Sequence, residues 1–571
     1  MQSYFPEIRK FSPTGMQILR KRYLSPGEST WNNVIDRVSN YVMNDWEEEP
    51  KQQAREMMLN RYFIPNSPCI VNSGKKNGGL LACFVVDFQD TIEDIYKTKL
   101  DFALIAKKGG GCGTTLTHIR PKGSIVAGST HGYSGGPVNF FDTICKDMEV
   151  MTQAGFRDMA MMGTISVYHP DILEFITAKE VEGKMTTTNM SVVVDNKFMQ
   201  AVENDTTFWT EFNNVKYQEY KAREVFNLIV EGSFRNGEPG ILFWDEINGN
   251  TPYKYVGIKI YSTNPCGEQP LPPNGSCNLG SIDISKYIKK DGNLDYEKLE
   301  LSVKLSVRFL DSVIDKNTFP TKEIEEVSLK SRQIGLGIMG LADYFLIKKI
   351  IYGSEESLVE LENILKFMYD VAELESIRMG KELGIPEWCQ KLPVPRRNIT
   401  LLSIAPTGTI SLLAGCNSGI EPIFSEIVIR NDKTGSYQFE NDLAHQPYFR
   451  CAVSANGNEK EVTWEEHVKI QASAQKHVDS GVSKTINFPN HTKRETIYNA
   501  FILAWLLGCK GITVYRNGSR KTEVLSPKNL KKDKCPACNS DIGIIKGIKK
   551  CLSCEWKMGE EIIVGDKAYV D

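Results

Sequence analysis

An α/β fold is predicted for most of the chain, because short apolar runs alternate with amphipathic helical segments from about residue 61 to about residue 520. Three of these runs have the length and continuity of buried strands: Leu80–Val86, Gly240–Trp244 and Ile399–Ala405. Strands that are apolar on both faces are typical of parallel sheets covered by helices. We therefore expect a parallel sheet that is buried on both sides.

The rest of the chain divides into shorter regions. Residues 1–60 are polar and read as a helical N-terminal region, with Trp46–Leu59 as one example. Residues 61–520 form the α/β domain. Residues 521–534 accumulate Lys, Ser, Pro and Asp and are predicted to be a linker. Residues 535–571 form a small tail that contains four cysteines.

The composition excludes several classes of function. Lysine and arginine number 68 and aspartate and glutamate 71, a net charge of −3, whereas a general nucleic-acid-binding protein has a basic excess. No run approaches the roughly 18 apolar residues that a membrane helix needs, and the first residues show no signal-peptide pattern. We expect a cytoplasmic protein that does not bind membranes and for which nucleic acid is a minor option. In that compartment its 14 cysteines serve metal or redox chemistry or are buried.

One short segment places three reactive side chains two residues apart: Asn264, Cys266 and Glu268. In an extended chain or at a loop tip, this spacing directs side chains to the same side. A thiol can give up a hydrogen atom, a carboxylate can accept the proton of a sugar hydroxyl, and an amide can hold the reacting oxygen. The alternative is that Cys266 is an ordinary buried thiol, although Pro265 and Gly267 favour a rigid loop in a pocket.

This segment resembles the finger loop of ribonucleotide reductases. Further motifs resemble that family, in the family's order, over most of residues 61–520: Ser67-Pro68, Ala82–Val85, Arg120–Gly123, Ser134–Val138, His169–Ile176, Glu238–Trp244, Ile334–Asp343, Ala405–Ser411, Ser483–Asn487 and Gly511–Arg516. The resemblance implies a ten-stranded α/β barrel, built from two five-stranded parallel halves in antiparallel arrangement, with the finger loop inside. It also implies the reduction of ribonucleotides to 2′-deoxyribonucleotides.

The resemblance also implies the roles of five residues. Cys266 would become the thiyl radical that takes the 3′ hydrogen atom of the ribose. Glu268 would deprotonate the 3′ hydroxyl, and Asn264 would hold the reacting oxygens. Cys83 and Cys277 would be the reducing pair that protonates the departing 2′ hydroxyl and ends as a disulfide. The alternative for this pair is two unrelated core cysteines.

Binding residues follow from the same resemblance. The substrate and its phosphates would be held by Ser67, Ala82, Pro406, Thr407, Gly408 and Thr409. The last four follow an apolar strand, where small residues and hydroxyls leave backbone N–H groups free for phosphate; read alone, 405–409 could equally be an ordinary strand-to-helix turn. A nucleoside triphosphate that sets specificity would bind near residues 85–165, where Asp90 would read the nucleoside and Arg120 and Lys122 would hold the triphosphate. The alternative for these three is solvated surface charge.

The chain departs from the family pattern at two positions. Gly155–Ala160 carries Asp158 where relatives have a second arginine in the loop that links effector and substrate, which puts the effector rules in doubt. Cys69 stands where threonine is common after Ser67-Pro68.

The source of the radical is inferred from the C-terminal third of the chain. The end of the chain does not resemble a glycyl radical site, and the strand Gly511–Arg516 carries one tyrosine, Tyr515, where subunits that receive a radical from a partner carry two. This pattern resembles the adenosylcobalamin-dependent class. The alternatives are a large subunit that needs a separate radical-generating subunit and a catalytically silent nucleotide-binding homologue. Whether diphosphates or triphosphates are reduced is left open, with diphosphates preferred.

The tail carries two Cys-x-x-Cys pairs, Cys535/Cys538 and Cys551/Cys554. This spacing is typical of a four-thiolate zinc ribbon, while the family resemblance implies a redox shuttle; both interpretations stay open. The resemblance further implies a thioredoxin- or glutaredoxin-like reductant. It also implies a homodimer formed through the helical segment near Phe140–Met151.

Overall fold

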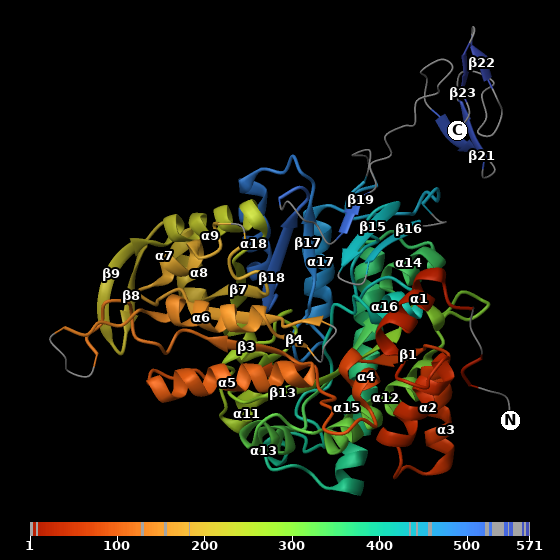
Figure 1. The fold of residues 1–571 in the computed structure, drawn as a ribbon, viewed down its shortest axis with the longest axis horizontal. Coiled ribbons are helices and arrows are strands. Elements are labelled where there is room, and N and C mark those ends of the chain that lie inside the picture. The colour runs from red at the N-terminus through yellow and green to blue at the C-terminus, as the bar shows by residue number, and fades with distance from the viewer. Residues whose placement is uncertain are drawn as a thin grey trace.

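The computed structural model describes residues 4–6, 10–126, 131–153, 157–181, 183–432, 435–440, 444–454 and 460–519, together with short strands beyond residue 524. In this part of the chain, no helix is long and apolar enough to cross a membrane. Figure 1 shows the N-terminal helices packed beside a large α/β body.

The N-terminal helices form a cap on one side of that body. They are α1 (Pro13–Ile18), η1 (Leu19–Tyr23), α2 (Trp31–Val42), α3 (Glu48–Leu59) and α4 (Ser67–Asn72). Helix α2 begins at a capping box made by Thr30 and Asn33 and buries one apolar face. These helices contact α12 (Tyr296–Lys316) and α16 (Ile410–Ala414) of the main body.

The first half of the body is a sheet of five parallel strands. In spatial order they are β2 (Cys83–Val85), β3 (Gly111–Thr115), β6 (Met161–Ser166), β7 (Thr188–Val194) and β10 (Gly240–Phe243). Their connections are α5 (Ile92–Lys108), α6 (Pro137–Glu149), α7 (Ile172–Thr177), α8 (Asn196–Glu203) and α9 (Ala222–Asn236). Parallel strands require such crossover connections, so the strand and helix pattern read from the sequence agrees with this half.

The second half consists of five parallel segments. They are β13 (Ser276–Asp283), β14 (Ile334–Met339), the extended chain at 402–404, the chain from 482 into β17 (Thr485–Phe488), and β18 (Gly511–Arg516). Single bridges, Leu336 to Leu402 and Ile404 to Val482, join the segment at 402–404 to its neighbours. The predicted strand at 399–405 is therefore an extended segment rather than a regular strand.

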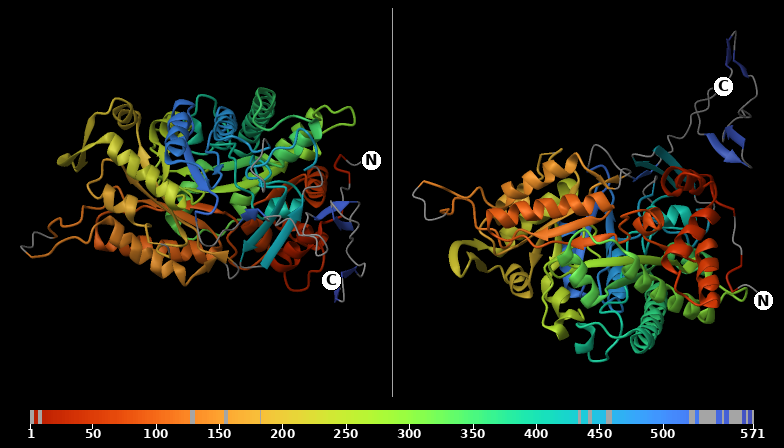
Figure 2. Two further views of the ribbon diagram at one scale, coloured as in Figure 1. Left: turned by 90° about the horizontal axis from the view of Figure 1, so that it is seen from above. Right: turned by 60° about the horizontal axis from the view of Figure 1, so that its bottom comes forward.

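Two antiparallel junctions close the two halves into a barrel. At one junction β2 pairs with β13, and at the other β10 pairs with β18. The predicted barrel of two antiparallel-arranged parallel halves is thus confirmed. Strand β1 (Phe63–Pro65) pairs antiparallel with residues 280–282 of β13, beyond the residues of β13 that pair with β2. Figure 2 shows the body from two further sides.

Further helices cover the outside of the barrel or connect its strands. They are α10 (Trp244–Gly249), α11 (Tyr253–Val256), η2 (Ile284–Lys286), α13 (Lys322–Ser331), α14 (Leu341–Lys348), α15 (Glu355–Leu383), η3 (Cys389–Lys391), α17 (Trp464–Gln475) and α18 (Arg494–Leu506). The remaining strands are β4 (Thr152–Gln153), β5 (Arg157–Asp158), β8 (Thr207–Phe212), β9 (Val215–Lys221), β11 (Ser262–Thr263), β12 (Pro270–Leu271), β15 (Ile427–Asp432), β16 (Gly435–Glu440), β19 (Leu525–Pro527), β20 (Ile542–Ile545), β21 (Ile548–Cys551), β22 (Ile562–Val564) and β23 (Lys567–Tyr569).

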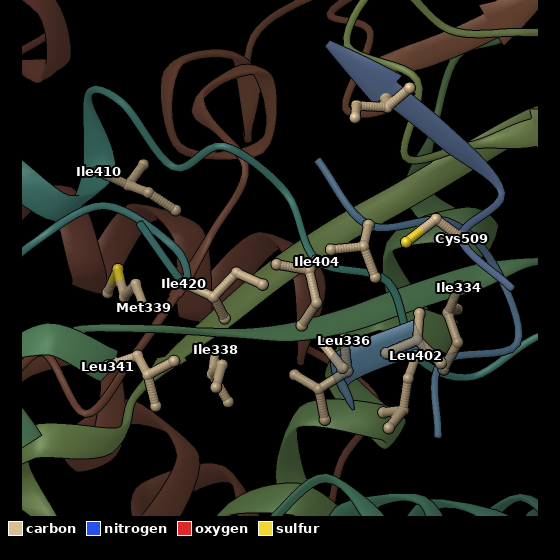
Figure 3. Close-up of a cluster of buried hydrophobic side chains, with 14 of the residues drawn as sticks. Ile334, Leu336, Ile338, Met339, Leu341, Leu402, Ile404, Ile410, Ile420 and Cys509 are labelled. Carbon is tan, nitrogen blue, oxygen red and sulfur yellow. The ribbon is translucent and has the colours of Figure 1, made fainter. Parts of the chain in front are cut away.

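Strand β14 shows how the sequence separates the inside of the barrel from the outside. Ile334, Leu336 and Ile338 belong to a buried apolar cluster with Leu402 and Ile404, as Figure 3 shows. The alternate positions are glycines. A Cβ on Gly335 would lie 2.7 Å from Nε2 of Gln269, which lies next to β12 in the finger loop. The alternation thus gives one packed face and one face on which the finger loop can approach the backbone.

Candidate active site

The finger loop is a β-hairpin that runs through the barrel. Strands β11 and β12 pair antiparallel, and residues 264–269 form its tip. The hairpin passes so close to β3 that a Cβ on Gly113 would lie 1.8 Å from the carbonyl oxygen of Thr263. Only glycine fits at that position, so the glycines of β3 belong to the architecture of the site.

Three contacts fix the tip of the hairpin. The side-chain amide of Asn189 on β7 donates to the carbonyl oxygen of Pro265 (2.7 Å). The backbone N–H of Gly481 and the hydroxyl of Ser403 both donate to the carbonyl oxygen of Glu268, at 2.8 and 3.0 Å. The tip is therefore held from both halves of the barrel, as a rigid catalytic loop requires.

Four of the five predicted catalytic residues form one buried cluster. The amide Nδ2 of Asn264 donates to Sγ of Cys83 (3.2 Å), and that thiol lies 4.0 Å from Oε1 of Glu268. Cys277 on β13 is the direct cross-strand neighbour of Cys83 on β2. None of the four side chains is more than 4 % exposed, so the carboxylate, the amide and the two thiols share a site from which water is largely excluded.

Burial sets the protonation of the two thiols. It raises the pKa of Cys83 well above the usual value of 9.0, and the charges of Glu268 and of the neighbouring cysteines raise it further. Burial likewise raises the pKa of Cys277, with Glu268 and Asp479 adding to the effect. Both cysteines therefore carry their hydrogens at neutral pH, which is the form that can donate protons and electrons.

A chain of hydrogen bonds orients the amide of Asn264. The hydroxyl of Tyr253 donates to Gln333 (2.5 Å), and the amide of Gln333 donates to the side-chain oxygen of Gln269 (2.7 Å). The backbone N–H of Gln269 then donates to Oδ1 of Asn264 (2.9 Å), which leaves Nδ2 to face the thiol of Cys83. The sequence analysis missed Tyr253 and Gln333, because nothing in an isolated glutamine or tyrosine indicates that the fold brings it to the finger loop.

Cys266 occupies a different position from the other four. It is exposed at the tip of the hairpin and lines a cavity of about 430 Å³. The walls of this cavity come from β7, β10, β17 and β18, and they include Tyr515 and Pro406. The cavity has the volume of a small-molecule site, and Cys266 lines it from the same loop tip that carries Asn264 and Glu268 of the buried cluster.

A buried cation forms part of the cavity wall. Nζ of Lys484 bonds to Glu421 (2.8 Å) and to Nδ1 of His467 (2.8 Å). Burial lowers the pKa of His467 well below 6.5, and the charge of Lys484 lowers it further. The imidazole is therefore neutral and accepts the hydrogen bond from Lys484. Ser483–Asn487 was noted in the sequence, but the partners of Lys484 were not.

The predicted phosphate-binding residues lie beside the N-terminal helices. Thr407 has a positive φ of 51°, and its hydroxyl accepts from the N–H of Gly419 (2.7 Å). Thr409 accepts from Arg22 (3.3 Å), and the hydroxyl of Ser67 bonds to that of Tyr23 (2.8 Å).

Other members of the predicted substrate set lie on the barrel. Ala82 precedes β2, and its carbonyl oxygen accepts from Gly111 (2.8 Å). Gly408 lies between the two threonines in the turn before α16. Pro406 is the member of the set that lines the same cavity as Cys266.

The three predicted effector residues take part in two different ion pairs. Asp90 and Arg120 pair directly (2.7 Å), and Oδ1 of Asp90 also accepts from the backbone N–H of Arg120. Lys122 instead pairs with Glu174 (3.1 Å). Side chains at Asp158 and its neighbours lie outside the described residues.

The four tail cysteines lie almost entirely outside the described part of the chain. Of Cys551, the structure describes only the backbone at the end of β21, and Cys535, Cys538 and Cys554 are not described. Among the described residues, no group of His, Cys, Asp and Glu side chains could hold a metal ion. The zinc and redox-shuttle interpretations of the tail thus stay predictions.

Comparison with known protein families shows to which family the chain belongs. The model described as "Ribonucleotide reductase, all-alpha domain" matches residues 9–78, and "Ribonucleotide reductase, barrel domain" matches residues 81–394 and 394–515. The chain belongs to the ribonucleotide reductase family. The resemblance noted in the sequence is therefore confirmed, and the barrel and finger loop are those of a reductase.

Individual relatives are similar over most of their length. The "Vitamin B12-dependent ribonucleoside-diphosphate reductase" of Thermoplasma acidophilum is 38% identical over 566 residues, covering 91% of this chain and 72% of the relative. The protein of the same name from Mycobacterium tuberculosis is 35% identical and covers 91% and 82%. Among solved structures, the Actinobacillus ureae class Id ribonucleotide reductase alpha subunit has the same fold, with a TM-score of 0.76 at 21% identity, covering 90% of this chain and 98% of that one.

Proposed function

We propose that this protein reduces ribonucleoside diphosphates to 2′-deoxyribonucleoside diphosphates and depends on adenosylcobalamin. One observation carries the proposal: Asn264, Glu268 and the opposed pair Cys83 and Cys277 share one buried cluster at the tip of the finger loop, which also carries Cys266. The relatives named as vitamin B12-dependent diphosphate reductases, at 35–38% identity, support both the cofactor and the phosphate level.

Each residue of the cluster has a chemical task in this reaction. Cys266, as a thiyl radical, takes the 3′ hydrogen atom of the ribose, while Glu268 accepts the proton of the 3′ hydroxyl. The thiols of Cys83 and Cys277 supply two electrons, the proton that lets the 2′ hydroxyl leave as water, and the hydrogen that becomes bonded to the 2′ carbon. They end joined as a disulfide, Glu268 returns its proton to the 3′ oxygen, and Cys266 returns its hydrogen atom to the 3′ carbon and becomes a thiyl radical again. Asn264, oriented through Gln333 and Gln269, holds the reacting oxygens.

The cavity beside Cys266 fits the nucleoside part of the cofactor. Its walls include four glycines, Gly237, Gly240, Gly267 and Gly511, which leave backbone groups accessible, and polar side chains such as Asn487 and Tyr515. Adenosylcobalamin held by these residues would supply radical chemistry, and the Cys266 thiol would give up its hydrogen atom at the cavity wall. The walls around the cavity would exclude water, and Asn189 would keep the finger loop fixed against them.

A nucleoside triphosphate effector and a second copy of the chain are further parts of the proposal. Asp90 follows β2 and Arg120 follows β3, and their ion pair supports an effector site within residues 85–165. Ile92, Tyr96 and Leu100 recur every four residues along α5 and are more than half exposed. This apolar stripe next to the effector segment supports a homodimer formed through α5 and α6.

The reductant and the tail complete the proposal. A disulfide between Cys83 and Cys277 must be reduced after each turnover, and a thioredoxin- or glutaredoxin-like dithiol in the cytoplasm would supply the electrons. The tail cysteines would either relay those electrons or bind zinc. Removal of residues 535–571 would separate the two roles, because a relay is needed only with a protein reductant and is bypassed by dithiothreitol.

The test is anaerobic turnover of CDP by the purified chain with adenosylcobalamin and dithiothreitol. We expect dCDP that depends on the cobalamin, is absent with Cys266→Ala, and persists with Cys509→Ala, whose buried cysteine lies outside the site. Turnover of CTP but not CDP would contradict the diphosphate level. A folded wild-type protein that forms product only with a separate radical-generating subunit would overturn the cobalamin dependence.

A further inference from the structure

Two consecutive residues of the N-terminal helices contact both parts of the predicted phosphate site. The guanidinium NH1 of Arg22 donates to Oγ1 of Thr409, and the hydroxyl of Tyr23 bonds to the hydroxyl of Ser67. Ser67 is the first residue of α4, which comes before most of the barrel strands in the chain. Thr409 directly precedes α16, which comes after most of them. The short helix η1 thus joins two segments that are otherwise remote in the chain.

The packing of the N-terminal helices fixes this contact. Helix α1, which runs directly into η1, packs on α16 so closely that a Cβ on Gly15 would lie 3.3 Å from the carbonyl oxygen of Leu412. Tyr23 is buried, and Arg22 is half-buried, whereas Arg20 and Lys21 beside it are exposed. Of these three basic residues Arg22 is the least exposed, and its guanidinium reaches the threonine turn.

A diphosphate bound at the threonine turn would need a positive charge beside it. Ser67, Thr407 and Thr409 offer neutral hydroxyls, whereas a nucleoside diphosphate brings negative charge. Because Oγ1 of Thr409 accepts from Arg22, its own hydrogen can be donated to a phosphate oxygen. Arginine pairs with phosphate through parallel N–H groups and keeps its charge under all conditions.

We propose that Arg22 is a substrate-binding residue that, together with Thr409, holds the diphosphate of the nucleoside diphosphate. The inference rests on the proposed function, since it concerns the same substrate. It assigns part of the active site to the N-terminal helical region, which would then supply the charged wall of the phosphate site.

The test is binding of labelled CDP by equilibrium dialysis without cobalamin, with dATP present to fill the proposed effector site. We expect Arg22→Met to weaken CDP binding by about tenfold to a hundredfold, the effect of losing a hydrogen bond to a charged group. Arg22→Lys should recover part of the loss, because a point charge remains. Arg20→Met, two residues away and exposed, is the matched control and should bind CDP as the wild type does.

Turnover adds a readout that a structural role would not move. Arg22→Met should raise KM for CDP by a similar factor and leave kcat within about threefold, because a ground-state phosphate contact is lost. Equal affinity of Arg22→Met and wild type for CDP would overturn the assignment and leave the proposed function intact. A wild type that binds no CDP would overturn both.

A second measurement uses the wild-type protein and does not depend on the folding of a variant. Phenylglyoxal modifies arginine side chains, and peptide mass spectrometry separates Arg20 from Arg22. We expect CDP, and inorganic pyrophosphate at higher concentration, to protect Arg22 while Arg20 reacts unchanged. Equal modification of Arg22 with and without CDP would contradict the proposal.

Discussion

Cys83 and Cys277 lie directly opposite each other where the two halves of the barrel meet, because β2 and β13 pair antiparallel in this register. Opposed residues of antiparallel strands have Cβ atoms about 4.5–5.5 Å apart, and a disulfide requires about 3.5–4.5 Å. A small approach of the two strands therefore joins the thiols. The register suits a pair that alternates between dithiol and disulfide.

The first prediction is that one turnover oxidises this pair. With adenosylcobalamin and CDP but no reductant, we expect the chain without residues 535–571, which cannot draw electrons from the tail cysteines, to form about one dCDP and one new disulfide, because the two thiols are the electron source. Peptide mass spectrometry should find Cys83 joined to Cys277. Cys277→Ser should give no dCDP, whereas Cys145→Ser, at a buried cysteine outside the cluster, should behave as the wild type. A disulfide elsewhere in the chain would contradict the assignment.

The second prediction concerns the reactivity of the three cysteines. Only the thiolate is a nucleophile, and burial raises the pKa of Cys83 and of Cys277 well above 9.0. We expect iodoacetamide to modify the exposed Cys266 first, and Cys83 and Cys277 far more slowly from pH 7 to pH 9. Their alkylation rates should still be rising with pH at pH 9, and a plateau below that pH would contradict the raised pKa. The measurement is quenched alkylation followed by peptide mass spectrometry.

The sequence predicted the fold well where local pattern and global packing agree. The apolar run Gly240–Trp244 was predicted to be a buried strand of a parallel sheet, and the structure has β10 there, parallel to β7 on one side and antiparallel to β18 on the other. The conformation of the run at 399–405 was less predictable. The backbone N–H groups of Leu401 and Leu402 donate hydrogen bonds to the carboxylate of Asp479 rather than to a neighbouring strand. Such a side-chain contact depends on tertiary structure.

The residues of the candidate site likewise fall into those that the sequence predicted and those that it did not. Asn264, Cys266 and Glu268 could be found because they lie within one short segment with recognisable spacing. Gln333, Asn189 and Arg22 could not, because each is a common residue type that the fold brings to the site from a distant element. The glycines of β14 were predictable only in part. Their alternation with apolar residues is visible in the sequence, but the reason for it, the hairpin inside the barrel, is visible only in the structure.

The third prediction follows from the close approach of β3 to the finger loop. Gly113→Ala puts a Cβ 1.8 Å from the carbonyl oxygen of Thr263, so the hairpin must shift by about an ångström or more. A shift of that size is expected to lower kcat by about a hundredfold and to lower the free energy of unfolding by about 1–3 kcal/mol. Activity assays and urea unfolding measure the two effects. Gly249→Ala, where no atom lies within 4 Å of the added Cβ, is the control; unchanged activity of Gly113→Ala would refute the close approach.

The fourth prediction tests the hydrogen-bond chain to Asn264. Gln333→Leu removes the donor to Gln269 and the acceptor for Tyr253, so two buried polar groups lose a partner at about 1–3 kcal/mol each. We expect kcat to fall by about tenfold or more while KM changes little, because Asn264 acts on the reacting oxygens. Tyr253→Phe removes only the outermost bond and should cost kcat less. A larger loss from Tyr253→Phe than from Gln333→Leu would contradict the order of the chain.

The fifth prediction concerns Asp343, whose carboxylate accepts the N–H of Asn417 (2.5 Å) in the loop after α16. Burial raises the pKa of Asp343 from 3.8 to about 7, and Asp283 adds to the shift. Between pH 4 and pH 7 the folded protein therefore keeps a proton that the unfolded chain has lost, and stability falls as the pH rises, by about 1.4 kcal/mol per pH unit.

Asp343→Asn keeps an acceptor for Asn417 and does not titrate. Comparison with the wild type therefore isolates the contribution of Asp343 titration to the free energy of unfolding. The free energy of unfolding of the variant, relative to that of the wild type, should increase from pH 4 to pH 7 and stay level above pH 7. Urea unfolding at each pH measures the difference. Asp370→Asn, on the exposed side of α15 and paired with Lys366, is the control and should change the difference by at most about 1 kcal/mol. A level difference for Asp343→Asn across the whole range would mean that the carboxyl of Asp343 is already ionised at pH 4, and that Asn417 rather than burial sets its pKa.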